Sequence, residues 1–113
     1  MKLTLLGTGC PSIDHNRCGS SNLITSKKTK ILVDCGSGVT QRLNQSGNSS
    51  ADIDALLLTH LHTDHVVDLY QLIISSWHSD RDSIWKIYGP QGTKKFIDKI
   101  FLSWRDERQL RIN

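Results

Sequence analysis

The sequence lacks the features that mark a membrane or secreted protein. No apolar run approaches the roughly 20 residues that cross a bilayer. The apolar start, Met1 to Leu6, is interrupted by Gly7 and has no small-residue cleavage site, so it does not predict a signal peptide. Only three cysteines are present, and none forms a CxxC pair. An odd number of unpaired cysteines is typical of reduced thiols, so we expect a cytoplasmic protein that does not contact membranes.

Histidine is absent after His78, and the excess of positive charge is small. The 14 lysines and arginines exceed the 11 acidic residues by three, for a formal charge of +3, which is modest for a protein that binds nucleic acid. Most of the lysines fall in predicted turns or on the polar side of a predicted helix, where solvent contact explains them. With 113 residues and 37% hydrophobic content, the chain can build one core. We therefore expect a single domain.

What the sequence does contain is a dense group of metal-binding side chains. His60, His62, Asp64 and His65 fall within six residues, directly after the apolar run 55–58. Neutral imidazole suits zinc, iron or manganese, and carboxylate adds negative charge. Successive helical residues are rotated by about 100°, so a single helix cannot direct all four side chains to one place. We therefore expect a loop after a strand that carries the first two histidines, followed by a helix that begins with Asp64 and His65.

Apolar periodicity and turn residues predict a mixed pattern of strands and helices. Apolar residues recur at helical spacing from Val66 to Trp77, which predicts one continuous amphipathic helix. The short apolar run Ile53–Leu58 is typical of a strand buried on both faces. The other expected strands are 2–6, 22–26, 30–33 and 84–88, with a hairpin turn at 26–29. The other expected helices are 38–46 and 93–104, capped by Thr93, with a polar loop at 48–52.

Several segments resemble the metallo-β-lactamase superfamily, in the order in which that superfamily carries them. The motif His60–His65 after a buried strand is similar to its metal-binding signature. The segments that resemble its N-terminal signature, its second strand and a later strand-to-helix turn are 6–11, 32–36 and 88–93. The resemblance runs from Lys2 to about Arg108. It implies an α/β fold, the N-terminal half of an αββα sandwich, with a mixed sheet and flanking helices.

The N-terminal signature is similar to that of the ribonuclease Z and arylsulfatase-like branch. Ribonuclease Z enzymes usually carry glycine and proline soon after the ligand motif, whereas this chain has Val67-Asp68-Leu69-Tyr70. We therefore favour an arylsulfatase-like, metal-dependent hydrolase of sulfate, phosphate or related esters, with a small-molecule substrate. The alternative enzyme is a transfer-RNA 3′-processing endonuclease, for which nucleic acid is the substrate.

The resemblance also implies roles for individual residues. In the intact enzyme, His60 and His62 would bind one zinc ion, and Asp64 and His65 a second; manganese and iron are the alternatives. The two metals would activate a water for attack on the ester, and Asp64 would be the catalytic residue that helps to orient this water. Asp34 would support the metal loop without binding metal. Arg17 would attract an anionic substrate.

The superfamily's remaining ligands are a histidine, a bridging aspartate and a final histidine, and none follows the turn at 88–93 in this sequence. The complete sandwich also needs roughly twice this length. We therefore interpret residues 1–113 as a partial domain that lacks the C-terminal half and is inactive alone. Because its sheet would lack a packing partner, we expect a homodimer. A non-catalytic, metal-poor interaction module is the alternative from a different functional class.

Other candidate motifs are weaker. Gly7-Thr8-Gly9 does not predict a dinucleotide site, because the third glycine and the following amphipathic helix are missing. His15 and His78 lie outside the motif, and we expect them to be exposed polar residues. Cys10 and Cys35 are expected to pack as small hydrophobic residues and not to bind metal.

Overall fold

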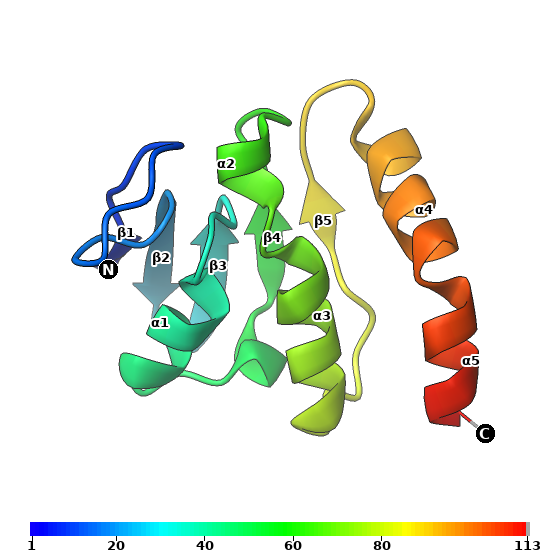
Figure 1. Ribbon diagram of the computed structural model, residues 1–113. Coiled ribbons are helices and arrows are strands. Elements are labelled where there is room, and N and C mark those ends of the chain that lie inside the picture. The colour runs from blue at the N-terminus through cyan, green and yellow to red at the C-terminus, as the bar shows by residue number, and fades with distance from the viewer. Residues whose placement is uncertain (113) are drawn as a thin grey trace.

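A five-stranded sheet forms the centre of the computed structural model, which describes residues 1–112 (Figure 1). The strands lie side by side in chain order. They are β1 Lys2–Gly7, β2 Ser21–Ser26, β3 Thr29–Val33, β4 Ala55–Leu57 and β5 Ile87–Tyr88. The first three pair antiparallel, whereas β3, β4 and β5 are parallel. This mixed sheet confirms the expected α/β class and the hairpin between β2 and β3.

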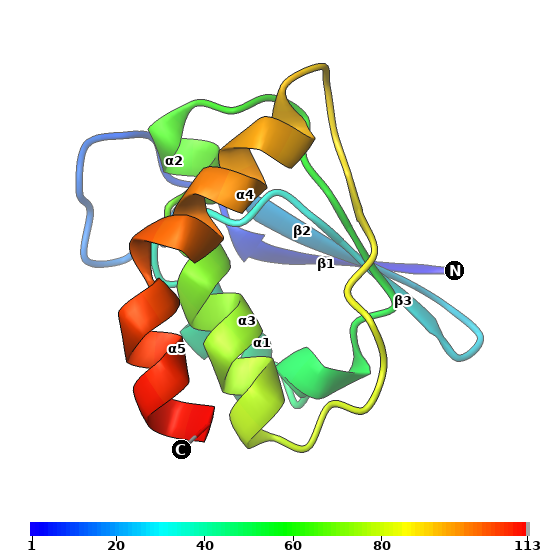
Figure 2. The same cartoon turned by 90° about the vertical axis from the view of Figure 1, so that its right-hand side faces the viewer.

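The helices cover one face of the sheet, as Figure 1 and Figure 2 show. They are α1 Val39–Gln45, α2 Thr63–Val66, α3 Leu69–His78, α4 Thr93–Ser103 and α5 Arg105–Ile112, with one 3-10 turn, η1 Ser50–Asp52. The connections from β3 to β4 and from β4 to β5 run in the same direction across the sheet. Right-handed crossovers therefore place α1 and α3 on the same side. Among residues 1–112, no helix is long and apolar enough to cross a membrane.

The hydrophobic core lies between the helices and the covered face of the sheet. Leu23, Leu32 and Leu56 are neighbours on β2, β3 and β4, and all three are buried. The helices contribute Val39 and Leu43 from α1 and Leu69 and Leu72 from α3. Burying one such side chain stabilises the fold by about 1.5–3 kcal/mol. This core fixes β4, the strand that leads into the ligand motif.

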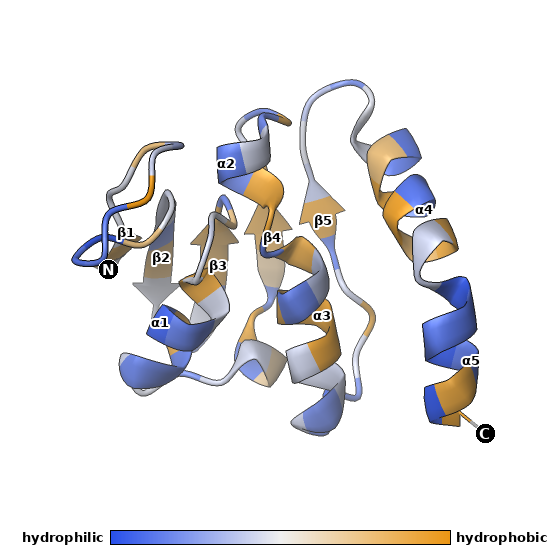
Figure 3. Ribbon diagram, viewed as in Figure 1, coloured by the Kyte–Doolittle hydropathy of each residue, from blue (hydrophilic) through white to orange (hydrophobic). Residues whose placement is uncertain are grey.

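The strand β4 differs from the expected strand Ile53–Leu58. It is shorter, and it is covered on one face only: Leu56 is buried, whereas Ala55 and Leu57 on the other face are half-buried. In Figure 3, β4 is hydrophobic along its length, whereas α5 is largely hydrophilic. The prediction of burial on both faces was therefore wrong for residues 1–112, because no layer of this chain covers the second face.

The expected continuous helix from Val66 to Trp77 is also wrong. The chain forms α2 and α3, separated at Val67 and Asp68. The break directs the Asp68 carboxylate to the start of α1, where it accepts hydrogen bonds from Thr40. Propensity and periodicity could not reveal this because the hydrogen-bond partner is 28 residues away in the sequence.

Smaller corrections concern the element ends. The predicted strand at 84–88 is paired only at Ile87–Tyr88, and the predicted loop at 48–52 contains η1. The helix at 93–104 is confirmed, but Thr93 does not cap it: its hydroxyl donates to Pro90 O at 2.7 Å. The helix α5 was not predicted, because its apolar residues are few and mostly exposed.

Candidate metal centre

The ligand motif lies at the carboxyl end of β4, and we call residues His60–His65 the donor loop. The chain leaves β4 after Leu57 and enters α2 at Thr63. The first two histidines therefore precede the helix, whereas Asp64 and His65 lie in its first turn, as expected. Sheets with parallel strands commonly bind ligands at this edge because the loops there lie outside the strand ends.

The four predicted donors lie close together. The ring centroids are 4.7 Å apart for His60 and His62 and 4.1 Å apart for His60 and His65. The carboxylate of Asp64 places Oδ2 3.3 Å from His65 Nε2. All four side chains are at least partly exposed, so their positions are not explained by core packing. They are brought together because a strand, a short loop and a helix follow one another directly in the chain.

Asp34 contacts the donor loop through His65 and the residue before the loop through Thr59. These contacts fit its expected role, which is to support the metal loop without binding metal. The residue is 4% exposed, and its carboxylate accepts hydrogen bonds from Thr59 N at 2.8 Å and Thr59 Oγ1 at 2.7 Å. The same carboxylate lies 2.8 Å from His65 Nδ1. Because a carboxylate can only accept, this ring nitrogen carries the proton, and Nε2 of His65 keeps its lone pair for a metal ion.

A second carboxylate, missed as a support by sequence analysis, ties the end of the donor loop to α1. Asp68 Oδ2 accepts from Thr40 N at 2.8 Å and from Thr40 Oγ1 at 2.6 Å, and Oδ1 accepts from Gly38 N at 3.4 Å. Backbone N–H groups at a helix start have no partner inside the helix, so Asp68 caps α1 from another element. We call Asp34, Thr40, Thr59 and Asp68 the support layer.

Cys35 connects β3 to α2 and to the start of α3 through its backbone. Its N–H donates to His65 O at 2.7 Å, and its carbonyl accepts from Asp68 N at 3.1 Å. Burial raises the pKa of the Cys35 thiol well above its ordinary value, and the nearby Asp68 and Asp34 raise it further. A neutral buried thiol behaves as a small hydrophobic group. Gly36 permits the close approach, since a Cβ there would lie 2.7 Å from Asp64 O.

The donor chemistry fits a divalent metal, but the set of ligands is incomplete. Imidazole and carboxylate are the ligands of zinc, iron and manganese sites. In the described part of the chain, no group of three or more His, Cys, Asp or Glu side chains is arranged to hold one ion. If the four donors of the loop served two ions, each ion would have two protein ligands, fewer than the three typical of catalytic zinc. The residues present therefore fit part of a metal centre and require further ligands.

A cavity of about 720 Å³ opens beside the donor loop. Residues of the donor loop and of the loop 10–18 both line it. Arg17 and His15 are among the lining residues; both are exposed, as expected for His15. A turn holds this loop: Arg17 N donates to Asp14 O at 3.1 Å and Asn16 N donates to Asp14 Oδ1 at 2.8 Å. The cavity that contains His62 and Asp64 therefore also contains Arg17 and His15.

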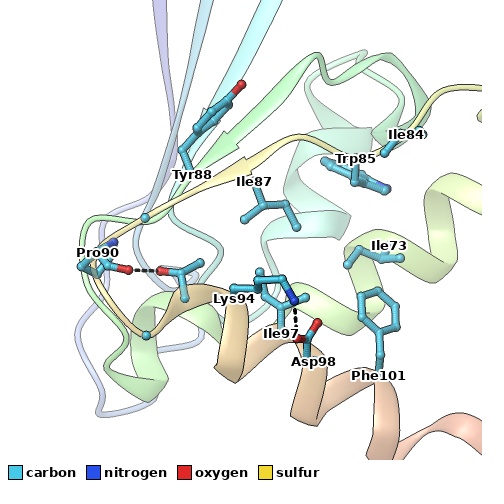
Figure 4. Close-up of a pocket in the computed structure, with 13 residues that line it drawn as sticks. Ile73, Ile84, Trp85, Ile87, Tyr88, Pro90, Lys94, Ile97, Asp98 and Phe101 are labelled. Atoms are coloured by element: carbon cyan, nitrogen blue, oxygen red, sulfur yellow. Dashed lines mark hydrogen bonds and ion pairs between the residues drawn. The ribbon is translucent and has the colours of Figure 1, made fainter.

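A second cavity, of about 700 Å³, lies between the segment 84–90, α3 and α4 (Figure 4). Its walls are mainly apolar, with Ile73, Trp85, Ile87, Ile97 and Phe101. At its rim Lys94 Nζ and Asp98 Oδ2 form an ion pair at 2.8 Å. No residue of the donor loop lines this cavity, so it is separate from the candidate metal centre.

Comparison with known proteins finds relatives over most of the chain. Residues 1–104 match the family model described as Anti-Pycsar protein Apyc1. The ribonuclease Z of Mycolicibacterium paratuberculosis is 43% identical over 115 residues, which cover 99% of this chain and 41% of the relative. That of Mycobacterium marinum is 40% identical over 103 residues, which cover 88% of this chain and 37% of the relative. The chain thus spans about two fifths of the length of these curated relatives.

Solved structures agree on the fold. The crystal structure of human tRNase Z, short form (ELAC1), has a TM-score of 0.82 and 30% identity, covering 93% of this chain and 40% of that chain. The metallo-β-lactamase fold protein YhfI from Bacillus subtilis has a TM-score of 0.75 and 28% identity, covering 86% and 39%. They confirm the resemblance to the metallo-β-lactamase fold. These relatives favour the ribonuclease Z alternative over the arylsulfatase-like assignment, despite the departure at 67–70.

Proposed function

Because the chain belongs to the Anti-Pycsar protein Apyc1 family and has the metallo-β-lactamase fold, we propose that it forms the first part of a metal-dependent hydrolase that cleaves phosphodiester bonds. The observation that carries the proposal is the gathering of three imidazoles and one carboxylate at the end of β4, above a buried aspartate. Exposed groups of this kind, held from beneath by a hydrogen bond, are typical of metal ligands.

The donor loop would hold the metal ions, with His60 and His62 on one and Asp64 and His65 on the other. Zinc fits these ligands, and manganese or iron are the alternatives. When bound, the metals would supply Lewis-acid polarisation of the ester and an activated water. Asp34 keeps His65 in the tautomer whose Nε2 faces the donors. The proposed catalytic part of Asp64 is to accept a hydrogen bond from the attacking water and so orient it.

The substrate chemistry follows from the relatives. Two of them are named ribonuclease Z and one solved structure is a tRNase Z, and a ribonuclease cleaves phosphodiester bonds in RNA. We therefore place transfer-RNA-like phosphodiesters ahead of the sulfate and other small-molecule esters that the sequence favoured. Arg17 supports an anionic substrate, because it lines the same cavity as Asp64 and forms no ion pair with any carboxylate of residues 1–112. Its proposed part is to contact a phosphate.

A graft tests the proposed function. Residues 1–113 replace the corresponding region of the Mycolicibacterium paratuberculosis ribonuclease Z, which supplies the rest of the fold. We expect the graft to hydrolyse bis(p-nitrophenyl) phosphate and a transfer-RNA precursor with added zinc or manganese. His62→Ala in the graft should lower the rate by at least about 100-fold, whereas His78→Ala, an exposed histidine outside the site, should leave it unchanged.

The unmodified 113-residue chain should be inactive in the same assay, because it carries too few ligands. A folded graft that cleaves p-nitrophenyl sulfate but neither phosphodiester would return the assignment to sulfate esters. Metal-dependent turnover by the 113-residue chain alone, lost in His62→Ala, would show that the donor set is already sufficient.

One observation favours a second candidate, a non-catalytic interaction module that holds little metal. Within residues 1–112, no three donors are already arranged around one ion. Isothermal titration with zinc separates the two candidates: an incomplete hydrolytic site should bind one ion weakly, and His60→Ala with His62→Ala should abolish the heat. Identical titrations of the two proteins would favour the interaction module.

One further feature belongs to the proposal. Cys10, Cys18 and Cys35 are all free thiols, which supports a reducing, cytoplasmic setting. This feature is not needed for the chemistry of the donor loop.

A further inference from the structure

Thr59 is the member of the support layer that contacts both the buried aspartate and the donor loop. It lies between the end of β4 and His60, and it is exposed. Its hydroxyl oxygen Oγ1 lies 2.7 Å from Asp34 Oδ2 and 2.9 Å from His60 Nδ1. Core packing therefore does not explain the position of this hydroxyl, whereas its two polar contacts do.

The direction of both hydrogen bonds follows from the number of protons. A threonine hydroxyl has one proton to donate and can also accept through its lone pairs. An ionised carboxylate has no proton, so the Thr59 hydroxyl donates to Asp34. The single proton is then used, and the hydroxyl accepts at its contact with His60. Nδ1 of His60 therefore carries a proton, and Nε2 keeps its lone pair.

His65 reaches the same state through a direct contact with the same carboxylate. Its Nδ1 donates to Asp34 Oδ2 at 2.8 Å. One buried aspartate thus acts on one histidine directly and on a second through the hydroxyl of Thr59. The rings of His60 and His65 are close, with centroids 4.1 Å apart. Both rings therefore have an unprotonated Nε2 within the candidate metal centre.

His62 differs from these two histidines. Within residues 1–112, hydrogen bonds to histidine rings involve His60, His65 and His78, so no group of the described chain fixes the tautomer of His62. Its ring contacts that of His60, with centroids 4.7 Å apart. His62 therefore serves as an internal comparison for the effect of Thr59.

We propose that Thr59 is a positioning residue that fixes the tautomer of His60 and so presents Nε2 of this histidine to a divalent metal ion. A metal ion binds the ring nitrogen that carries no proton. Without the hydroxyl, nothing in the described chain would hold the proton on Nδ1, and the form protonated at Nε2 has no lone pair there for a metal. This role rests on the proposed function, but the hydrogen bonds that produce it exist without metal.

Nitrogen-15 NMR of the metal-free 113-residue chain measures the tautomers. At about pH 8 an ordinary histidine is neutral, and long-range proton–nitrogen correlations distinguish a protonated ring nitrogen from an unprotonated one. We expect a single form of His60, protonated at Nδ1. Thr59→Val keeps the shape of the side chain but removes the hydroxyl, and should convert His60 to a mixture of both forms. His65 and His62 should keep the signals that they have in the unchanged chain.

Zinc titration of the same proteins gives the second measurement. Thr59→Val should weaken zinc binding by at least about 10-fold. Thr59→Ser restores a hydroxyl and should recover both the single tautomer of His60 and the zinc affinity. The matched control is Thr29→Val, at an exposed threonine that begins β3; it should change the affinity by less than about twofold. Circular dichroism shows whether each variant folds.

His60 protonated at Nε2 in the unchanged chain would overturn the inference, even if no variant folded. So would a folded Thr59→Val protein in which His60 kept the single Nδ1-protonated form, or one that bound zinc as tightly as the unchanged chain. The proposed function is tested separately, because the tautomer is measured without metal or substrate. A graft that failed to hydrolyse phosphodiesters would leave the tautomer of His60 as it is.

Discussion

The donor loop and the support layer beneath it are built in opposite ways. In the donor loop, the three histidines and Asp64 are at least partly exposed, and their side chains lie close together. In the support layer, Asp34 and Asp68 each accept several hydrogen bonds, and the nearby Leu56 of β4 is fully buried. We therefore expect metal binding and folding stability to depend on different residues, with Asp34 contributing to both. Substitutions in the two regions should therefore have separable effects.

The largest effect on stability is expected at Leu56, in the strand that leads to the donor loop. Leu56→Ala leaves a cavity under the helices and should reduce the free energy of unfolding by about 3–5 kcal/mol, much of the total for a domain of this size. Urea unfolding followed by circular dichroism measures it. The neighbour Leu57 is half-buried on the opposite face of β4, so Leu57→Ala should lose only about 1–2 kcal/mol. Equal losses would mean that both faces are covered.

The next largest effect is expected at Asp68. Asp68→Ala removes the acceptor for Thr40 N and Thr40 Oγ1 and should reduce the free energy of unfolding by about 2–3 kcal/mol. Asp68→Asn keeps one acceptor oxygen and should lose less. Any loss of zinc binding should be explained by the unfolded fraction, so the folded Asp68→Ala protein should bind zinc as tightly as the unchanged chain. Unchanged urea midpoints for Asp68→Ala would show that the carboxylate does not hold α1 and the loop together.

Asp34 tests whether one residue contributes both to metal binding by the donor loop and to the stability of the fold. Asp34→Asn weakens the fixation of His65 and should lower zinc affinity by about 10–100-fold, while reducing the free energy of unfolding by about 1–2 kcal/mol. Zinc titration and urea unfolding of the same sample measure both. Asp82→Asn, at an exposed aspartate, is the control. If Asp34→Asn lost stability but kept full zinc affinity, Asp34 would contribute to folding only and not to metal binding.

The smallest effect on stability is expected at His62, together with a large effect on zinc binding. Because this side chain is exposed, His62→Ala should change the free energy of unfolding by less than about 0.5 kcal/mol. Zinc binding should nevertheless be lost in titration calorimetry. The control His78→Ala should retain it. A strongly destabilised His62→Ala protein would show that the donor loop also contributes to folding stability, contrary to the difference drawn between it and the support layer.

Local patterns were sufficient for most elements. The hairpin of β2 and β3, the helix α1 and the helix α4 follow from turn residues and apolar spacing, and the structure has all three. The motif His60–His65 lies between a strand and a helix, as its spacing required. These features depend on residues near one another in the sequence, and for that reason sequence analysis could reach them.

Features that depend on distant contacts were missed or wrong. The break between α2 and α3 depends on hydrogen bonds that the Asp68 carboxylate accepts from residues about 30 positions earlier. The stripe from Val66 to Trp77 was interpreted as the apolar side of one continuous helix, but Leu69 and Leu72 lie in the core, whereas Tyr70 stacks on Trp104 with ring centroids 4.9 Å apart. Periodicity shows that a helix is apolar on one side, but it does not show which element packs there.

The sequence by itself determined the identity and order of the candidate metal donors, because a short motif after a strand needs no distant partner to be recognised. It also determined the α/β class, through the spacing of apolar residues. Only the tertiary structure decided that the Asp34 carboxylate accepts its hydrogen bond from Nδ1 of His65, that Arg17 and Asp64 line the same cavity, and that the Asp68 carboxylate holds the start of α1. These three facts depend on side chains that the fold brings together, and residues so far apart in the sequence give no sign that they are in contact.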